Sequence, residues 1–119
     1  MTDKQNTDCE ACHEDAERLS ELQAVKKLSE IPGWVILERK GILQLFKTYK
    51  FSNFLIAIEF ANRVGLLAEK HQHHPELQIE WGSTSVYWWS HKIRGLHHLD
   101  FELAKATDLC LDSKVEISY

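Results

Sequence analysis

The sequence contains no apolar run that approaches the ~20 residues a helix needs to cross a bilayer. Its first residues, MTDKQNTDCEACHEDAER, have no apolar core of the kind found in signal peptides. Nor is there a dense cluster of Lys and Arg. The net charge is -4, so the usual electrostatic basis for binding nucleic acid or an anionic membrane is missing. Together these absences predict a cytoplasmic protein that binds neither a membrane nor nucleic acid directly.

Cysteine is also scarce. The three cysteines are an odd number, with Cys9 and Cys12 close together and Cys110 far away, which argues against a disulfide framework and fits a reducing compartment. The segment Cys9-x-x-Cys12-His13 could supply three zinc ligands, but a closed structural site needs a fourth, and no second pair at similar spacing is evident. We therefore predict no metal site here.

What the sequence does contain is the composition of an ordinary globular domain: 119 residues, of which 44% are hydrophobic and 27% charged. This length is enough for one core, and we find no internal repeat beyond two helix-hairpin halves. Residues 1–14 are polar and lack apolar periodicity. We predict a flexible N-terminal segment over residues 1–14 and a single domain over residues 15–119.

Apolar periodicity predicts a helix and a hairpin at the start of this domain. Apolar residues recur at threes and fours over residues 16–30, as in an amphipathic helix, and Pro32-Gly33 then ends the pattern. Residues 34–38 and 43–51 are rich in β-branched and aromatic residues, with the turn-forming segment ERKG between them. These two runs indicate a β-hairpin.

The longest predicted helix begins after Ser52, a suitable N-cap, and continues to about His71. It is apolar on more than one face, which predicts packing against both a sheet and a second layer or partner subunit. Pro75 prevents further helix and favours an extended conformation at His74. His73 and His74 are therefore expected just past the end of this helix.

Two further strand-like runs, LQIEW and TSVYWWSHK, are separated by Gly82-Ser83 and predict a second hairpin. The spacing of apolar residues from Leu99 to about Leu111 predicts a final helix, and VEISY a short tail or edge strand. The order αββαββα predicts an α+β fold, a four-stranded antiparallel sheet with three helices on one face.

Alternation within TSVYWWSHK assigns its side chains to two faces. One face is predicted to carry Tyr87, Trp89 and His91, and the other Val86, Trp88 and Ser90. Most of the aromatic residues of this region are expected in the core or in subunit contacts, namely Trp81, Tyr87, Trp88 and Trp89. Aromatic walls with convergent titratable groups are nevertheless what a pocket for a flat heterocycle requires.

The segment EKHQHHPEL places three of the seven histidines within four residues. Zinc helices place two imidazoles four residues apart with a Glu beside the first, and the spacing of His71, His73 and His74 does not match. An acid/base role fits better, because imidazole can both give and take a proton near neutral pH. The pair alone leaves a solvated helix end open as an alternative, and His91 is the third imidazole that favours catalysis.

Other polar residues have simpler interpretations. Asp100 is expected as the N-cap or a first-turn residue of the final helix. Glu69, four residues before His73, either orients that imidazole or is a surface helix residue. His97 and His98 are assigned to a solvated loop.

The pattern Glu69-x3-His73-His74-Pro75, followed by Trp81, His91 and Asp100, closely resembles the signature of the pterin-4a-carbinolamine dehydratases. The segments WWSHKIRGLHHLDFELA and CEACHEDA are similar to bacterial members. The resemblance implies a dimer or a dimer of dimers of the α+β fold described above. It also implies loss of water from 4a-hydroxytetrahydropterin, giving quinonoid dihydropterin in support of pterin-dependent aromatic amino acid hydroxylation, without a metal or organic cofactor.

By this similarity, His73 and His91 are the expected acid/base pair, and His74 is expected mainly to position the pterin. Pro75 and the stretch Ser90 to Ile93, which includes Lys92, match positions that contact substrate in the family. Glu69 and Asp100 match carboxylates that lie behind the substrate contacts or at the rim of the pocket. Leu77 stands where animal relatives carry a Trp, so the side chain of the natural pterin stays open.

Three alternatives remain open from the sequence. Animal members of the family also act as dimerisation cofactors of a homeodomain transcription factor, so the same fold could serve a non-catalytic role in protein binding. The substrate could be a different pterin, for example one related to molybdopterin-type cofactors. The last alternative is a metal-binding stress protein that uses Cys9, Cys12 and the histidines.

Overall fold

A computed structural model describes residues 16–112. The predicted flexible segment 1–14, the Cys9-x-x-Cys12-His13 motif and the VEISY tail lie outside the described residues. Within them the chain forms α2 (Glu21–Lys27), η2 (Leu28–Glu30), β1 (Val35–Arg39), β2 (Ile42–Lys50), α3 (Phe54–His71), β3 (Glu76–Glu80), β4 (Ser83–Trp88), α4 (His98–Leu109) and η3 (Cys110–Asp112).

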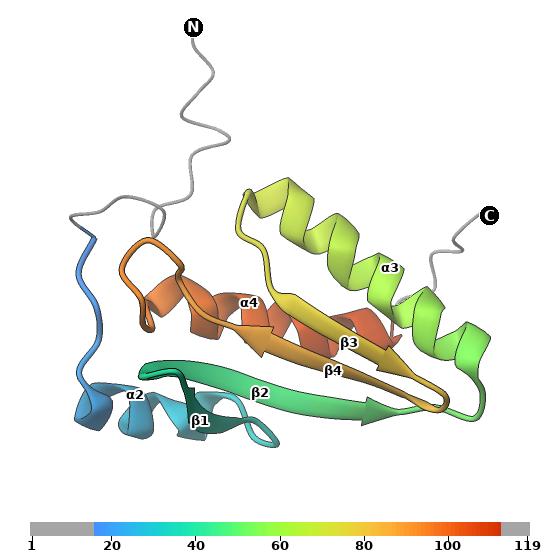
Figure 1. Cartoon of the computed structure of the whole chain (residues 1–119), viewed down its shortest axis with the longest axis horizontal. Helices are drawn as coiled ribbons and strands as arrows, with labels where there is room; N and C mark the ends of the chain where they lie inside the picture. The colour runs from blue at the N-terminus through green and yellow to red at the C-terminus, as the bar shows by residue number, and fades with distance from the viewer. Residues whose placement is uncertain (1–15, 113–119) are drawn as a thin grey trace, which may run out of the picture.

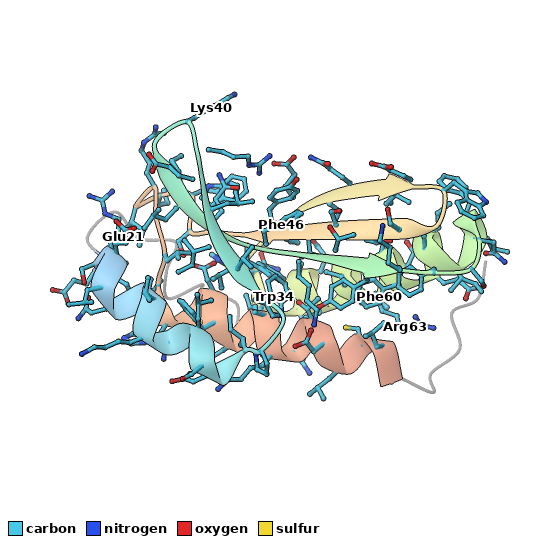
Figure 2. All side chains as sticks on the ribbon, turned by 90° about the horizontal axis from the view of Figure 1, so that it is seen from below. Glu21, Trp34, Lys40, Phe46, Phe60 and Arg63 are labelled. Carbon is cyan, nitrogen blue, oxygen red and sulfur yellow. The ribbon has the colours of Figure 1, made fainter. Side chains whose placement is uncertain are left out.

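The four strands form one antiparallel sheet in the order β1-β2-β4-β3 (Figure 1). The two hairpins therefore meet through their second strands, with Leu45 of β2 opposite Trp88 of β4. The helices lie on one side of the sheet and the other side is open (Figure 2). The predicted α+β architecture, with four antiparallel strands and three helices, is confirmed.

The core lies between the sheet and the helices. Its members alternate with outward-facing residues along the strands, as a half-buried sheet requires. The largest fully buried apolar side chains are Trp88, Phe60, Phe101, Ile31, Leu45 and Leu96. Trp88 also donates a hydrogen bond from Nε1 to Thr107 Oγ1 on α4, at 2.9 Å, so the indole is both packed and satisfied.

Two helix starts differ from the prediction. The first helix begins at Glu21, not near Ala16, because Ser20 accepts from the backbone N–H of Gln23 and the Gln23 side chain accepts from Ser20 in return. The long helix is capped by Asn53, whose side chain accepts from Ile56 N–H, and not by Ser52. Both corrections concern which of several neighbouring residues is the N-cap of the helix.

The long helix is apolar beyond its buried face, as predicted. Ala57, Phe60 and Val64 face the core, whereas several large apolar side chains of α3 are exposed, namely Phe54, Leu55, Ile56 and Leu66. On α2, Leu22 and Val25 are exposed as well. Trp81, expected with the core or subunit-contact aromatics, is largely exposed in the tight turn between β3 and β4.

Candidate active site

The end of α3 places the two adjacent histidines on opposite sides of the chain. Gln72 adopts a left-handed conformation with φ of 53°, and its N–H bonds to the carbonyls of Ala68 and Glu69. The backbone then extends toward β3, so His73 and His74 alternate as strand residues do. His73 is only 2% exposed, whereas the His74 side chain is 54% exposed.

The end of β4 shows the same alternation. Trp88 and Ser90 are fully buried on the helix side, Trp89 is half-buried, and His91 is exposed. The predicted assignment of faces therefore holds beyond Trp88, where the regular strand ends. The register of β3 with β4, continued past its last pair, aligns His73 with Ser90 and His74 with Trp89.

Asp100 joins three segments of the chain in a buried hydrogen-bond network. Its Oδ1 lies 2.8 Å from Nε2 of His73, and its Oδ2 accepts from the Ser90 hydroxyl at 2.7 Å and from the His97 backbone N–H at 3.0 Å. Asp100 itself is fully buried. A carboxylate without water contact is stabilised only by such donors, so the network holds the His73 ring in a defined orientation.

The same network begins α4. His97 is the N-cap of this helix: its Nδ1 accepts from Leu99 N–H at 3.0 Å, and Asp100, at the third helical position, bonds back to it. The prediction of a solvated loop is therefore wrong for His97, and His98 is the first residue of the helix. Asp100 is a first-turn residue, one of the two positions predicted for it.

Aromatic rings flank two of the three histidines. The His73 ring stacks on Trp88, with centroids 5.8 Å apart and planes 3° apart. The His91 ring stacks on Trp89, at 4.4 Å and 18°. These contacts restrict both imidazoles and leave His91 accessible to solvent on the open side of the sheet.

Glu69 pairs with His74 and not with His73. Its Oε2 lies 2.6 Å from His74 Nε2, and both side chains are mostly exposed. The helical spacing of four residues that suggested His73 does not apply, because the left-handed residue Gln72 intervenes and changes the direction of the chain. His71 is an exposed residue at the end of α3, as predicted.

The loop after His91 is fixed by the segment that precedes α2. Ser90 and Gly95 exchange two backbone hydrogen bonds, and Arg18 donates from Nη1 to the carbonyls of Ile93 and Arg94, both at 3.2 Å. A Cβ added to Gly95 would lie 2.2 Å from Arg18 Cδ, so glycine is what allows this approach. Of the expected substrate contacts in this loop, Lys92 is exposed and Ile93 is half-buried.

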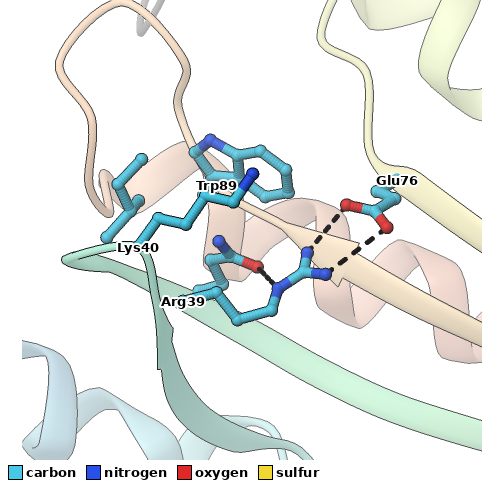
Figure 3. Close-up of a pocket in the computed structure, with 6 residues that line it drawn as sticks. Arg39, Lys40, Glu76 and Trp89 are labelled. Carbon is cyan, nitrogen blue, oxygen red and sulfur yellow. Dashed lines mark hydrogen bonds and ion pairs between the residues drawn. The ribbon is translucent and has the colours of Figure 1, made fainter.

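A hollow on the open side of the sheet adjoins the Trp89 ring (Figure 3). Arg39 reaches across it from one edge strand to Glu76 on the other, at 2.7 Å, and its guanidinium lies 3.8 Å from the Tyr87 ring centroid. The hydrogen bond from Arg39 is the main cause that lowers the pKa of Glu76 below its ordinary value. No local pattern predicts this pair, because the two residues come from different hairpins.

The sequence profile of the family described as Pterin 4 alpha carbinolamine dehydratase matches residues 17–110. The chain belongs to this family. Two relatives, provisionally named pterin-4-alpha-carbinolamine dehydratases, support the assignment. That of Hahella chejuensis is 52% identical over 82% of this chain and 87% of its own length, and that of Saccharophagus degradans is 48% identical over 91% and 96%.

Solved structures show the pterin-4a-carbinolamine dehydratase fold as well. A transcriptional coactivator/pterin dehydratase from Brucella melitensis superposes with a TM-score of 0.70 at 28% identity, over 79% of this chain and 98% of that protein. A pterin dehydratase-like protein identified as a RuBisCO assembly factor in the alpha-carboxysome has a TM-score of 0.57 at 16% identity, over 69% and 93%, and supports the fold alone.

Seen as a member of this dehydratase family, the chain brings most of its predicted site residues to one end of the sheet. Asp100 contacts both His73 and Ser90, and His74 is bonded to Glu69. Pro75 and His91 directly follow His74 and Ser90 in the chain. Arg18, Arg39 and Gln44 were not predicted. Gly95 indicates a close contact, and the alternation along β2 indicates which face Gln44 lies on. Neither pattern shows which residue makes the contact.

Two further properties concern the part of the chain that the structure describes. None of its helices has the length and apolar character of a membrane span. Over residues 16–112, no three His, Cys, Asp or Glu side chains come together in an arrangement that could hold a metal ion. Cys9, Cys12 and His13 lie outside this range.

Proposed function

We propose that this protein removes water from 4a-hydroxytetrahydropterin to give quinonoid dihydropterin, in support of pterin-dependent aromatic amino acid hydroxylation. The observation that carries the proposal is the arrangement of imidazoles at one end of the sheet. His73 is held by Asp100, which also binds Ser90, and His91 is the next residue after Ser90. Membership of the dehydratase family supports a pterin as the substrate.

The reaction needs one proton donor and one acceptor. Hydroxide is a poor leaving group, so an imidazolium donates a proton to the 4a-hydroxyl as the C4a–O bond breaks and water departs. A neutral imidazole takes the proton from N5, and the electrons of the N5–H bond form the C4a=N5 double bond. The proton lost from N5 equals the proton gained by the leaving group, so no oxidant or reductant is required.

Within this mechanism, His73 and His91 form the acid/base pair. The Asp100 carboxylate orients His73 and can offset the positive charge of its protonated ring, which suits a proton donor. His91 is exposed and its ring stacks on Trp89, so it can exchange protons with water between turnovers. His74, bonded to Glu69 and exposed, positions the pterin from the other strand end.

The surrounding segments supply the remaining contacts to the pterin. Pro75 fixes the path of the chain after His74, and the loop from Ser90 to Ile93 offers backbone groups held in place by Arg18. Lys92 is exposed beside His91 and can contact substrate without losing an internal partner. The pterin ring then lies at the strand ends, where His74 and His91 are exposed and only the edge of the buried His73 ring reaches the surface.

Assembly into a homodimer or homotetramer belongs to the same proposal. The exposed apolar side chains of α3, Phe54, Leu55, Ile56 and Leu66, lie on a helix whose other face is already packed in the core. Exposed apolar surface of this kind favours contact with another subunit. Light scattering of the purified protein would give the mass that distinguishes a monomer from either oligomer.

The proposed reaction is tested by stopped-flow measurement of dehydration, with 4a-hydroxytetrahydropterin generated by a pterin-dependent hydroxylase. We expect catalysed loss of the intermediate in proportion to protein concentration. A rate equal to the spontaneous one at all protein concentrations would overturn the proposal.

A non-catalytic role in protein binding is the second candidate. It is favoured by the same exposed apolar residues of α3, and by the name of the Brucella melitensis structure, a transcriptional coactivator/pterin dehydratase. Such a role would not need the imidazoles. It predicts that a variant with His73, His74 and His91 replaced keeps its binding partner, whereas Leu55→Asp and Leu66→Asp lose it.

A further inference from the structure

His97 holds the start of α4 with both its side chain and its backbone. Its Nδ1 accepts from the Leu99 N–H, its own N–H donates to Asp100 Oδ2, and its carbonyl accepts from the Asp100 N–H, all at 3.0 Å. Because Asp100 Oδ1 bonds to His73 Nε2, one carboxylate joins the start of this helix to the orientation of the His73 ring. A side chain outside the predicted site therefore acts on a proposed catalytic imidazole through Asp100.

Histidine is an unusual residue for this cap. The residues preferred as N-caps are Ser, Thr, Asp and Asn, whose side chains do not change charge near neutral pH. An imidazole does change charge there, and a ring nitrogen can accept a hydrogen bond only while it carries no proton. Protonation of His97 Nδ1 would set one donor against another, the Leu99 N–H, so α4 keeps this cap only while the ring is neutral.

Protons can reach the His97 ring from solvent. The residue is half-buried and lines a hollow of about 230 Å³. The charged or titratable groups that face it are Glu17 and Arg18 in the segment before α2, and His98 and Asp100 on α4. Glu17 and Arg18 carry opposite charges and act in opposite directions on a charge at His97. The cap can therefore respond to the pH of the solvent although Asp100 is buried.

We propose that His97 is a positioning residue for the acid/base pair, an inference that rests on the proposed dehydration. With the His97 ring neutral, the capped first turn of α4 holds Asp100, and Asp100 holds the His73 ring. With the His97 ring protonated, the first turn loosens and the bond from Asp100 to His73 loses its fixed geometry. Turnover then falls on acidification by more than titration of the catalytic imidazoles alone explains.

Two substitutions separate the cap from its titration. His97→Asn keeps a capping side chain that does not titrate, whereas His97→Ala removes the cap and keeps the backbone N–H that bonds to Asp100. At about pH 8, His97→Ala should lower Tm by about 4–8 °C, the effect of one lost cap. In stopped-flow dehydration it should lower kcat about two- to tenfold and keep KM within about twofold, because His97 acts through Asp100. His97→Asn should match the unaltered protein in all three quantities.

The same comparison at about pH 5.5 tests the titration of the ring. There the kcat of the unaltered protein should be about two- to tenfold below that of His97→Asn, because protonation removes the cap of the unaltered protein alone. His98→Asn is the matched control: it replaces the neighbouring imidazole, 5.9 Å away, and leaves the cap in place, so it should follow the unaltered protein at both pH values. Equal pH profiles for the unaltered protein and His97→Asn would overturn the proposal, and this comparison stands if His97→Ala does not fold.

NMR of the imidazoles distinguishes a failure of this proposal from a failure of the dehydratase proposal. Nitrogen chemical shifts show which ring atom carries the proton, and at about pH 8 we expect the His97 proton on Nε2 and none on Nδ1. The His73 ring signals should move in His97→Ala and stay in place in His97→Asn. Unmoved His73 signals in folded His97→Ala, or an unchanged kcat with a lowered Tm, would overturn the positioning role alone. No catalysed dehydration by the unaltered protein would overturn the proposed reaction and the kinetic role of His97 with it.

Discussion

Replacement of Asp100 by Asn tests two roles of the buried network: stabilising the fold and orienting the His73 ring. Asn has the same shape but no charge, and its Nδ2 donates where a carboxylate oxygen accepted. In place of Oδ2 this donor meets the His97 N–H, and in place of Oδ1 it requires His73 Nε2 to accept, which excludes the protonated ring. One buried donor left unsatisfied costs ~1–3 kcal/mol, so we expect ~2 kcal/mol of lost stability. At ~4–8 °C per kcal/mol for a domain of this size, Tm should fall by about 10 °C.

The effect on turnover should be larger than this loss of stability explains. The carboxylate that orients His73 and offsets its charge is absent in Asp100→Asn, so kcat should fall at least about tenfold. The loss should stay below the ~10²–10⁴ that a whole proton-transfer group contributes, because the His73 imidazole itself is kept. The KM should change less, because Asp100 is fully buried and does not face solvent. The measurements are thermal unfolding and stopped-flow dehydration at a temperature well below the Tm of the variant.

Asp108 provides a matched control on the same helix. It also accepts from three donors, Trp34 Nε1, Lys47 Nζ and Tyr49 Oη, but its side chain is 32% exposed and touches no histidine. Asp108→Asn should therefore lower Tm by a few degrees, since water can replace a lost partner, and leave kcat unchanged. An unchanged kcat in Asp100→Asn, or an equal loss in Asp108→Asn, would refute the assignment of Asp100 to the orientation of His73.

The remaining predictions concern other contacts. Gly95→Ala should lose ~1–3 kcal/mol in chemical denaturation because the new Cβ displaces Arg18, and the cost should largely vanish in an Arg18→Ala background; full additivity would refute the clash. In NMR titration, Arg39→Gln should raise the pKa of Glu76 toward its ordinary value. Because that pKa is lowered on folding, the pair stabilises the protein above the ordinary carboxyl pKa of ~4, and the stability difference between unaltered protein and variant should shrink as pH falls through the lowered value. A difference that grew on acidification would contradict this sign. Burial raises the pKa of Cys110, so its alkylation at pH 8, followed by peptide mass mapping, should be much slower in folded than in urea-unfolded protein.

The fold could be predicted because its elements follow from local pattern. Two hairpins with turn glycines and three runs of apolar residues at helical spacing leave few alternatives to a four-stranded sheet covered on one side. The errors lie at element ends. Ser20 and Asn53, and not their neighbours, form the caps, because the choice among adjacent capping residues depends on the tertiary position of the chain.

The site was predictable only in part. The period of two along TSVYWWSHK correctly separated His91 from Ser90, since alternation is a local property. The pairing of Glu69 with His74, of Asp100 with His73, and of Arg39 with Glu76 depends on how distant segments meet. No spacing in a single sequence encodes such contacts, and the one local rule that was applied to Glu69 fails at a left-handed residue.

The central claim is that imidazoles at the ends of α3 and β4 together move the two protons of dehydration. It is tested most directly by the stopped-flow rate with 4a-hydroxytetrahydropterin for the unaltered protein, His73→Gln, His91→Gln and the double variant, each shown to be folded by circular dichroism. The account predicts a loss of ~10²–10⁴ in kcat for each single variant and a return to the spontaneous rate for the double variant. Catalysis by the folded double variant at the rate of the unaltered protein would contradict it.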